Sequence, residues 1–182
     1  HDDLLEKLVQ RAARLTPGDP MDPKTRLGAL VSKTQMDRVL DYVETGKREG
    51  AVPILPGGRA GTRGYFVKPT IFDSADQSMK IAQEEIFGPV LTVLTFETTD
   101  ELVEKANSTI YGLAAAVWTR DIAKAHRLAG ELQAGTVWIN AYNMLSPQSP
   151  FGGYKQSGYG RELGRHGIDL YTQVKSVWVS LA

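Results

Sequence analysis

The stretch from Gln83 to Val90 places two adjacent carboxylates, Glu84 and Glu85, against an Ile-Phe pair and a Gly-Pro turn. A carboxylate held beside the end of a buried strand can accept two hydroxyl hydrogen bonds, which is the pattern that a ribose diol offers. The structural alternative is a helix end whose carboxylates are solvated. The residues alone leave both interpretations open.

A second stretch with chemical potential is the glycine-rich segment 149–158, Ser-Pro-Phe-Gly-Gly-Tyr-Lys-Gln-Ser-Gly. Its glycines allow close backbone approach and positive φ angles. Together with the preceding residues, it offers an apolar pocket wall made of Tyr142, Leu145 and Phe151. The alternative is an ordinary surface loop with one buried aromatic side chain.

Two other patterns predict no ligand. The glycines at 158, 160 and 164 resemble a dinucleotide fingerprint, but no strand directly precedes them and the chain ends before an acidic residue about 20 positions later. The histidines His1, His126 and His166 have no metal-ligand spacing, so we expect no metal site.

Composition excludes further classes of function. Lys+Arg and Asp+Glu are both 21, and this zero net charge removes the electrostatic case for a nucleic acid or an acidic membrane as partner. The 182 residues include no cysteine, so this chain has no disulfide, thiolate metal site or cysteine nucleophile. We expect a cytoplasmic protein. The start at His1, without an initiator Met or a signal peptide, indicates a piece of a longer polypeptide.

The elements that would position these residues follow from hydrophobic periodicity. Helices are predicted from Leu4 to Leu15 and around residues 36–46, and extended segments at 51–55 and 65–72. Three apolar strands, at 90–96, 113–118 and 136–139, alternate with helices that Thr98 and Asp121 can cap. This β-α-β-α-β order predicts an α/β fold with a parallel sheet covered by helices on both faces. Because ligands of such sheets bind beyond the carboxyl ends of the strands, a site is expected at the loop 140–160.

Several motifs in this order resemble the aldehyde dehydrogenase superfamily, and the resemblance covers essentially the whole chain. They are Glu-Glu-Ile-Phe-Gly-Pro-Val at 84–90, Asn-Ser-Thr-Ile-Tyr-Gly-Leu-Ala-Ala-Ala-Val at 107–117, Gly-Thr-Val-Trp-Ile-Asn at 135–140, Pro-Phe-Gly-Gly-Tyr-Lys-Gln-Ser-Gly at 150–158 and Gly-Arg-Glu at 160–162. The resemblance implies that residues 1–171 are the C-terminal portion of the catalytic domain and that 172–182 are an oligomerisation strand.

The resemblance also implies roles for single residues. Glu85 matches the glutamate that binds the ribose hydroxyls on the nicotinamide side of NAD or NADP, and Phe87 matches an aromatic residue near the nicotinamide. The loop with Tyr142, Leu145 and Phe151 matches the lining of the aldehyde tunnel. Leu145 is often aromatic in relatives that prefer small aliphatic aldehydes. Glu162 matches a glutamate that assists proton or water movement.

The family's reaction oxidises an aldehyde to a carboxylic acid through a cysteine thiohemiacetal and a thioester. The resemblance places that cysteine, its glutamate base and the cofactor domain upstream of His1, so we expect the 182-residue chain alone to be inactive. The alternatives are a stand-alone, non-catalytic oligomerisation module and a semialdehyde-specific or acylating member of the superfamily. The terminal strand, residues 172–181, implies a homodimer or homotetramer, because an unpaired edge strand needs a partner.

Overall fold

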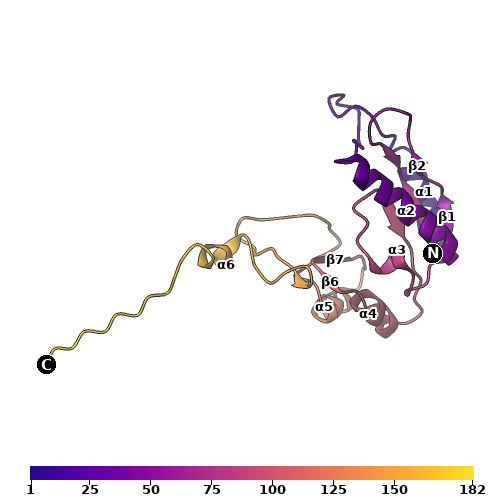
Figure 1. The fold of residues 1–182 in the computed structure, drawn as a ribbon. Helices are drawn as coiled ribbons and strands as arrows, with labels where there is room; N and C mark the ends of the chain where they lie inside the picture. The colour runs from indigo at the N-terminus through magenta and orange to yellow at the C-terminus, as the bar shows by residue number, and fades with distance from the viewer. The chain divides into compact units, whose positions relative to one another are not determined.

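The computed structural model describes residues 1–182, and the chain divides into two compact units, residues 1–97 and 98–182. In the first unit the elements are α1 (Asp2–Ala12), α2 (Lys33–Glu49), β1 (Val52–Leu55), β2 (Gly58–Arg59), β3 (Val67–Lys68), β4 (Thr70–Asp73), α3 (Lys80–Gln83) and β5 (Val90–Thr92) (Figure 1). In the second they are α4 (Thr99–Asn107), β6 (Tyr111–Gly112), β7 (Ala114–Val117), α5 (Ile122–Glu131), β8 (Thr136–Ile139), β9 (Tyr154–Lys155) and α6 (Gly164–Asp169).

The first unit is built on a three-stranded sheet in the order β1-β4-β5. Strand β4 pairs antiparallel with β1 and parallel with β5, where Thr70 lies opposite Val90. The N–H of Thr70 also donates to the carbonyl of Pro89 at 2.9 Å, so the Gly-Pro turn leads directly into the parallel pair. Strands β2 and β3, which lie between β1 and β4 in the sequence, form a separate antiparallel pair.

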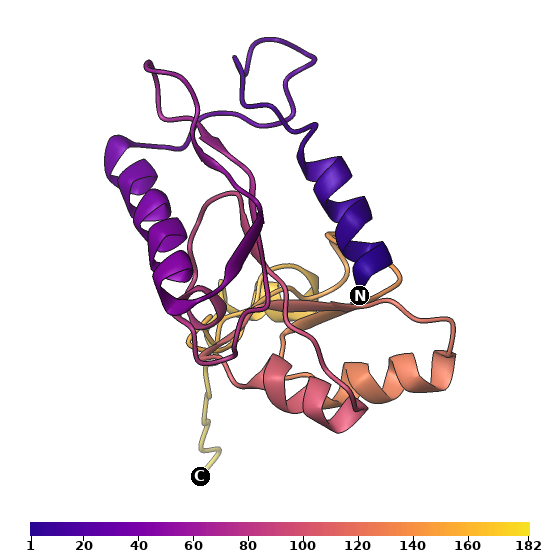
Figure 2. The same ribbon diagram turned by 90° about the vertical axis from the view of Figure 1, so that its right-hand side faces the viewer.

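Helix α2 supplies four of the nine buried residues in the core of this unit. It begins where the Ser32 hydroxyl accepts a hydrogen bond from the Gln35 N–H at 3.1 Å, and it ends at Gly50, whose φ of 103° closes the helix in the left-handed conformation. Its apolar side chains, Met36 and Val39 among them, are buried against Phe72 of β4. Figure 2 shows α2, in purple, lying alongside the strands of the sheet.

The second unit contains the strand–helix–strand pattern that the sequence predicted. Thr98 accepts from the Glu101 N–H at 3.1 Å and Asp121 from the Lys124 N–H at 3.0 Å, so both predicted helix caps are confirmed. Strands β7 and β8 run parallel, with Ala114 opposite Thr136. Leu128 of α5, together with Leu132 directly after this helix, packs onto the pair, and α4 contributes Leu102 and Val103 to the same core.

The predicted single parallel sheet is not observed. Strand β5 pairs with β4, and β7 and β8 form a separate two-stranded sheet. The residues of β7 in the core, Ala115 and Val117, alternate along the strand, so α4 and α5 cover the same face of the β7-β8 pair. Coverage of both faces is therefore not confirmed for this pair. Apolar patterning predicts a buried strand but does not say which strand lies beside it.

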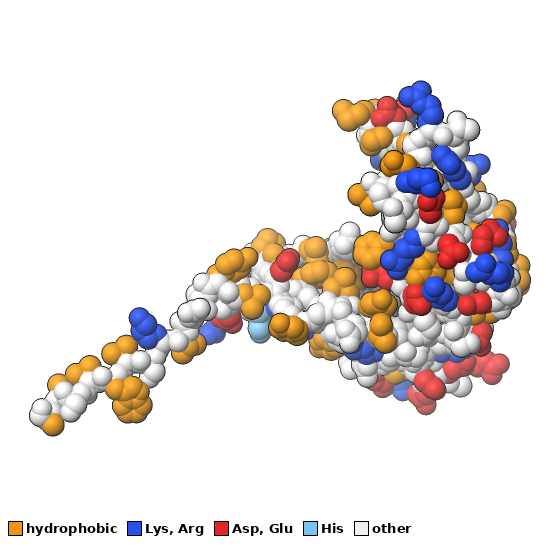
Figure 3. All heavy atoms as spheres, viewed as in Figure 1, with side chains coloured by type: hydrophobic (Ala, Val, Ile, Leu, Met, Phe, Trp, Pro, Cys, Tyr) orange, Lys and Arg blue, Asp and Glu red, His pale blue; other side chains and the backbone are white.

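The C-terminal segment was expected to be a strand. Residues 172–182 form neither helix nor strand, and all of them are exposed. Figure 3 shows the hydrophobic side chains along this segment, in orange, open to solvent. A strand requires a hydrogen-bonded neighbour, and no other segment of this chain pairs with these residues.

No helix of the chain combines the length and the apolar composition of a membrane-spanning segment.

Candidate functional site

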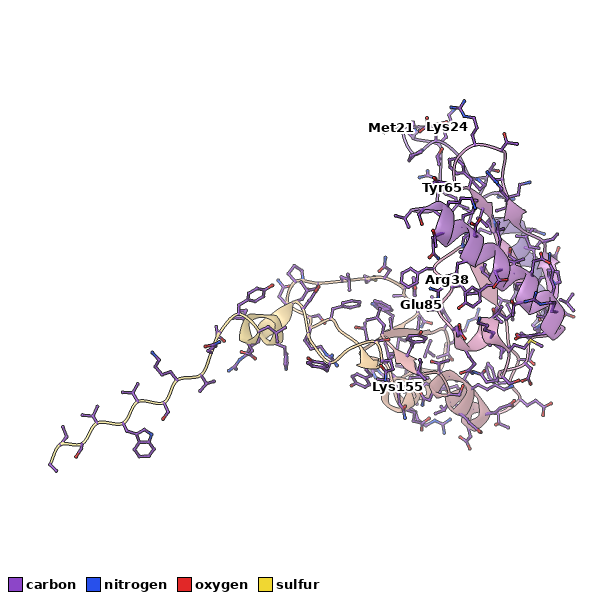
Figure 4. The ribbon with its side chains drawn as sticks, in the orientation of Figure 1. Met21, Lys24, Arg38, Tyr65, Glu85 and Lys155 are labelled. Carbon is purple, nitrogen blue, oxygen red and sulfur yellow. The ribbon has the colours of Figure 1, made fainter.

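One face of α2 holds the segment that contains Glu85 and Phe87. The side-chain amide of Gln35 donates to the main-chain carbonyls of Ile86 and Phe87, at 2.9 and 3.1 Å. The guanidinium of Arg38, one helical turn further on, donates to the carbonyl of Glu85 at 3.3 Å. Figure 4 shows Arg38 and Glu85 next to each other. Three successive carbonyls of the segment are therefore bound by side chains of α2.

A third side chain on this helix binds the segment through a carboxylate. The hydroxyl of Tyr42 donates to Oε2 of Glu84 at 2.5 Å, and Tyr42 itself is only 4% exposed. The same carboxylate oxygen lies 3.9 Å from Nζ of Lys80, which also sits 5.0 Å above the Tyr42 ring. Arg38 donates to the Tyr42 hydroxyl at 3.3 Å. Glu84 thus has one hydrogen-bond donor, Tyr42, and one nearby cation, Lys80.

Along residues 85–87, exposed and buried side chains alternate. Ile86 is buried in the core, whereas Glu85 is exposed and Phe87 is 70% exposed. Phe87 has a φ of 56°, in the left-handed region that non-glycine residues seldom adopt. Gly88 packs against α2, because a Cβ at this position would lie 2.5 Å from Cγ2 of Val39. The core side of this segment is therefore fixed, and its two candidate functional side chains face outward.

Glu85 and Phe87 line an open cavity of about 360 Å³, together with Ile81, Ala82, Glu84, Ile86, Gly88, Val90, Thr92 and Leu94. The carboxylate of Glu85 makes no hydrogen bond or ion pair within the chain. Both of its oxygens are therefore available to a ligand, as the interpretation as a diol acceptor requires. The size of the cavity is in the range of small-molecule sites. No three His, Asp or Glu side chains form a cluster that could hold a metal ion.

The remaining candidate residues lie in the second unit, on the loop after β8 and just beyond it. Asn140 begins this loop with a φ of 52°, and its amide bonds both the N–H and the carbonyl of Thr119 at 2.9 Å. The indole N–H of Trp138 donates to the carbonyl of Met144 at 2.8 Å. The ring of Tyr142 packs edge-on against Trp138, with centroids 5.3 Å apart. Trp138 therefore holds the loop through two contacts.

Phe151 and Glu162 are joined through their backbones. The N–H of each donates to the carbonyl of the other, at 2.8 and 2.7 Å. Phe151 is half-buried and the Glu162 side chain is exposed. Leu145 and Tyr142 are also exposed.

Between Phe151 and Glu162, the chain is tied to the end of α4. Nζ of Lys155 donates to the carbonyls of Asn107 and Thr109, at 2.6 and 3.0 Å (Figure 4 labels Lys155). These two hydrogen bonds connect β9 to the backbone at the C-terminal end of α4.

The structure brings some of the predicted residues together and not others. Glu85 and Phe87 share one cavity, and Phe151 lies opposite Glu162. Leu145 makes no contact of this kind with either of them. Sequence reasoning missed Gln35, Arg38 and Tyr42, which fall at helical spacing on one face of α2. That spacing is visible in the sequence, but the groups that these side chains bind, the carbonyls of residues 85–87 and the carboxylate of Glu84, are distant in the sequence.

Comparison with known proteins identifies the family of the chain. A sequence profile described as the aldehyde dehydrogenase family matches residues 1–177. The chain is 50% identical over 181 residues to the putative aldehyde dehydrogenase DhaS of Bacillus subtilis, and 51% identical over 181 residues to the mitochondrial aldehyde dehydrogenase of Homo sapiens. It superimposes on the NAD⁺ complex of an aldehyde dehydrogenase from Bacillus cereus with a TM-score of 0.94 at 52% identity.

These matches cover 100% of this chain, but only 37%, 35% and 37% of the three relatives. The chain therefore spans a little over a third of the length of the proteins that it resembles. The matched profile, the level of identity and the superposition agree with one another. The chain belongs to the aldehyde dehydrogenase family.

Proposed function

We propose that the chain is the C-terminal part of an enzyme that oxidises an aldehyde to a carboxylic acid with NAD or NADP, and that Glu85 binds the nicotinamide-side ribose of that cofactor. One observation carries the proposal. The carboxylate of Glu85 lines a cavity of about 360 Å³ without a partner in the chain, while side chains of α2 bind the backbone around it. The B. cereus relative is a complex with NAD⁺, which supports NAD.

The residues around this cavity fit one part of a nicotinamide nucleotide. The two oxygens of Glu85 can accept both hydroxyls of a ribose diol, and the exposed ring of Phe87 offers an apolar surface for the neighbouring nicotinamide. The cofactor, when bound, supplies the acceptor for the hydride that leaves the substrate. The contribution of this chain is to orient the ribose and to exclude water beside the ring.

In this proposal, the other candidate residues act on the aldehyde and not on the cofactor. Tyr142, Leu145 and Phe151 form part of the tunnel wall, and Glu162 assists proton movement near the reacting carbon. No residue of this chain is a cysteine, so the nucleophile of the proposed thiohemiacetal and thioester pathway lies outside it. We therefore propose that the 182-residue chain alone is inactive.

The exposed C-terminal segment supports a proposal about assembly. Residues 172–182 are extended and unpaired and carry Val174, Val177, Trp178 and Val179 on their surface. We propose that this segment pairs with the sheet of another subunit in a homodimer or homotetramer. The cytoplasmic location stays a prediction, since the relatives include mitochondrial enzymes.

The first experiment is the intact mass of the native polypeptide that contains residues 1–182, here called the parent polypeptide. A mass well above twice 20.0 kDa is expected. A mass near 20.0 kDa would instead support the non-catalytic module. The purified parent polypeptide is then assayed with NAD and NADP against a panel that includes betaine aldehyde and indole-3-acetaldehyde, since relatives carry the names of both substrates.

The role of Glu85 is tested in the same protein. Glu85→Gln keeps the shape but weakens the acceptor, and it should raise the Kd for NADH about tenfold with little change in the KM for the aldehyde. The matched control is Glu104→Gln, because Glu104 is exposed on α4 and makes no hydrogen bond or ion pair. An unchanged Kd in Glu85→Gln would refute the ribose role.

A further inference from the structure

The orientation of Glu85 depends on its neighbour. Glu84 ends α3 in an extended conformation, with φ −111° and ψ 151°. The Glu84 carboxylate is bound by Tyr42 of α2, whereas the next side chain, Glu85, is exposed and lines the cavity.

The conformation that follows is strained. Phe87 adopts a φ of 56°, a strained conformation that a non-glycine residue keeps only where its surroundings hold it there. The Gln35 amide holds the two carbonyls at 86 and 87, and Ile86 is anchored in the core. At the other end of the segment, the hydrogen bond from Tyr42 fixes Glu84. Both ends of the segment, Glu84 and residues 86–87, must be held in place to define the directions of the Glu85 and Phe87 side chains.

We propose that Tyr42 is a positioning residue of the cofactor pocket, and that its hydroxyl, bound to Glu84, directs the Glu85 carboxylate and the Phe87 ring into the cavity. This inference rests on the proposed function of that cavity. Tyr42 is buried on α2 and does not line the cavity, so it acts through Glu84 and does not touch the cofactor itself.

The competing explanation is that Tyr42 is only a core residue. Its ring is part of the hydrophobic cluster that contains Met36, Val39 and Phe72, and this would account for its burial. Packing alone does not need the hydroxyl, however, and the hydroxyl is bonded at 2.5 Å to a carboxylate at the start of the segment. Removal of the hydroxyl without the ring separates the two explanations.

The test uses the parent polypeptide and fluorescence titration with NADH, with thermal unfolding measured in parallel. Tyr42→Phe retains the ring and should raise the Kd for NADH about three- to tenfold, because the hydroxyl's hydrogen bonds to Glu84 and from Arg38 are lost, whereas Glu84→Ala removes only the first of them. Glu84→Ala should have a similar effect, and the double variant should lose no more than the larger of the two single variants. Glu84→Gln keeps an acceptor oxygen and should bind NADH within about twofold of the native protein. Tyr65→Phe, at an exposed tyrosine whose hydroxyl makes no hydrogen bond, is the control and should be unchanged.

Each outcome has a defined meaning. If Tyr42→Phe and Glu84→Ala lower the Tm but leave the Kd for NADH unchanged, Tyr42 is a structural residue and the proposal is wrong. If Glu85→Gln weakens NADH binding and these two variants do not, the ribose site stands and only the positioning role fails. If Glu85→Gln itself has no effect, the proposed cofactor pocket fails, and the positioning role fails with it.

Discussion

Phe151 and Glu162 form a hydrogen-bonded antiparallel pair, because each N–H donates to the carbonyl of the other, at 2.8 and 2.7 Å. Residues directly opposite each other in such a pair project their side chains to the same side. The proposed tunnel wall and the proposed accessory carboxylate are thereby placed next to each other without any side-chain bond between them.

Because the backbone of Glu162 makes both hydrogen bonds, its side-chain carboxylate can be changed without removing them. In the parent polypeptide, Glu162→Gln retains both backbone bonds and removes only the ionised carboxylate. We expect kcat to fall about tenfold, because a group that assists proton transfer is lost. The midpoint of urea unfolding should stay the same. A large drop in stability with unchanged kcat would show that the carboxylate has a structural role instead.

Trp138 should control the aldehyde side of the site. Trp138→Phe removes the N–H that bonds the carbonyl of Met144 and reduces the surface against which Tyr142 packs. Because the loop then loses an anchor, the KM for the aldehyde should rise about threefold or more, with the Kd for NADH unaffected. Steady-state kinetics checks this, and Tyr65→Phe, at an exposed tyrosine of the first unit, is the control.

Gly135 is required by a close approach of two backbones. A Cβ at this position would overlap the carbonyl oxygen of Gly152, which is main chain and not a flexible side-chain end. Gly135→Ala should therefore reduce the free energy of unfolding by about 1–3 kcal/mol in a denaturant titration. Gly130→Ala in α5 is the matched control, because a Cβ there meets nothing within 4 Å. This control should be neutral, or more stable by about 0.5–1 kcal/mol.

The contact between His1 and Asp73 predicts a pH dependence. Hydrogen bonds to Asp2 and Asp73 raise the pKa of His1 above its usual 6.5. For Asp73, partial burial acts to raise the pKa, but hydrogen bonds from the Ser74 backbone and from His1 outweigh it and hold the pKa below 3.8. The contribution of His1 to stability is present below pH 6.5 and lost as the pH rises through its folded pKa. That of Asp73 is present above pH 3.8 and lost as the pH falls through its folded pKa.

An NMR titration of the His1 imidazole measures this effect directly. The native protein should titrate above pH 6.5, and Asp73→Asn should move the midpoint back toward that value while the contact with Asp2 remains. A midpoint that Asp73→Asn does not change would show that the two side chains are not paired in solution.

The helix caps were predicted correctly from the sequence, but the strand predicted at 90–96 spans only Val90–Thr92, and the pairing of the strands was not predicted. The helix caps at Thr98 and Asp121 involve atoms three residues apart, so the residue types suffice to predict them. The partner of β5 was missed because pairing depends on chain folding over longer distances. The same reason explains why the bond from Tyr42 to Glu84, which are 42 positions apart, left no trace in the pattern.

The bonds from Gln35 and Arg38 end on main-chain carbonyls, so they are indifferent to which side chains occupy positions 85–87. The backbone conformation of residues 85–87 therefore does not depend on the chemical nature of the side chains at 85 and 87. A lineage, or a designer, can exchange the side chains at 85 and 87 to suit another ligand while the backbone stays in place. Substitutions of Gln35, Arg38 or Tyr42 on α2 do not offer this freedom, because each removes a hydrogen bond that holds the segment.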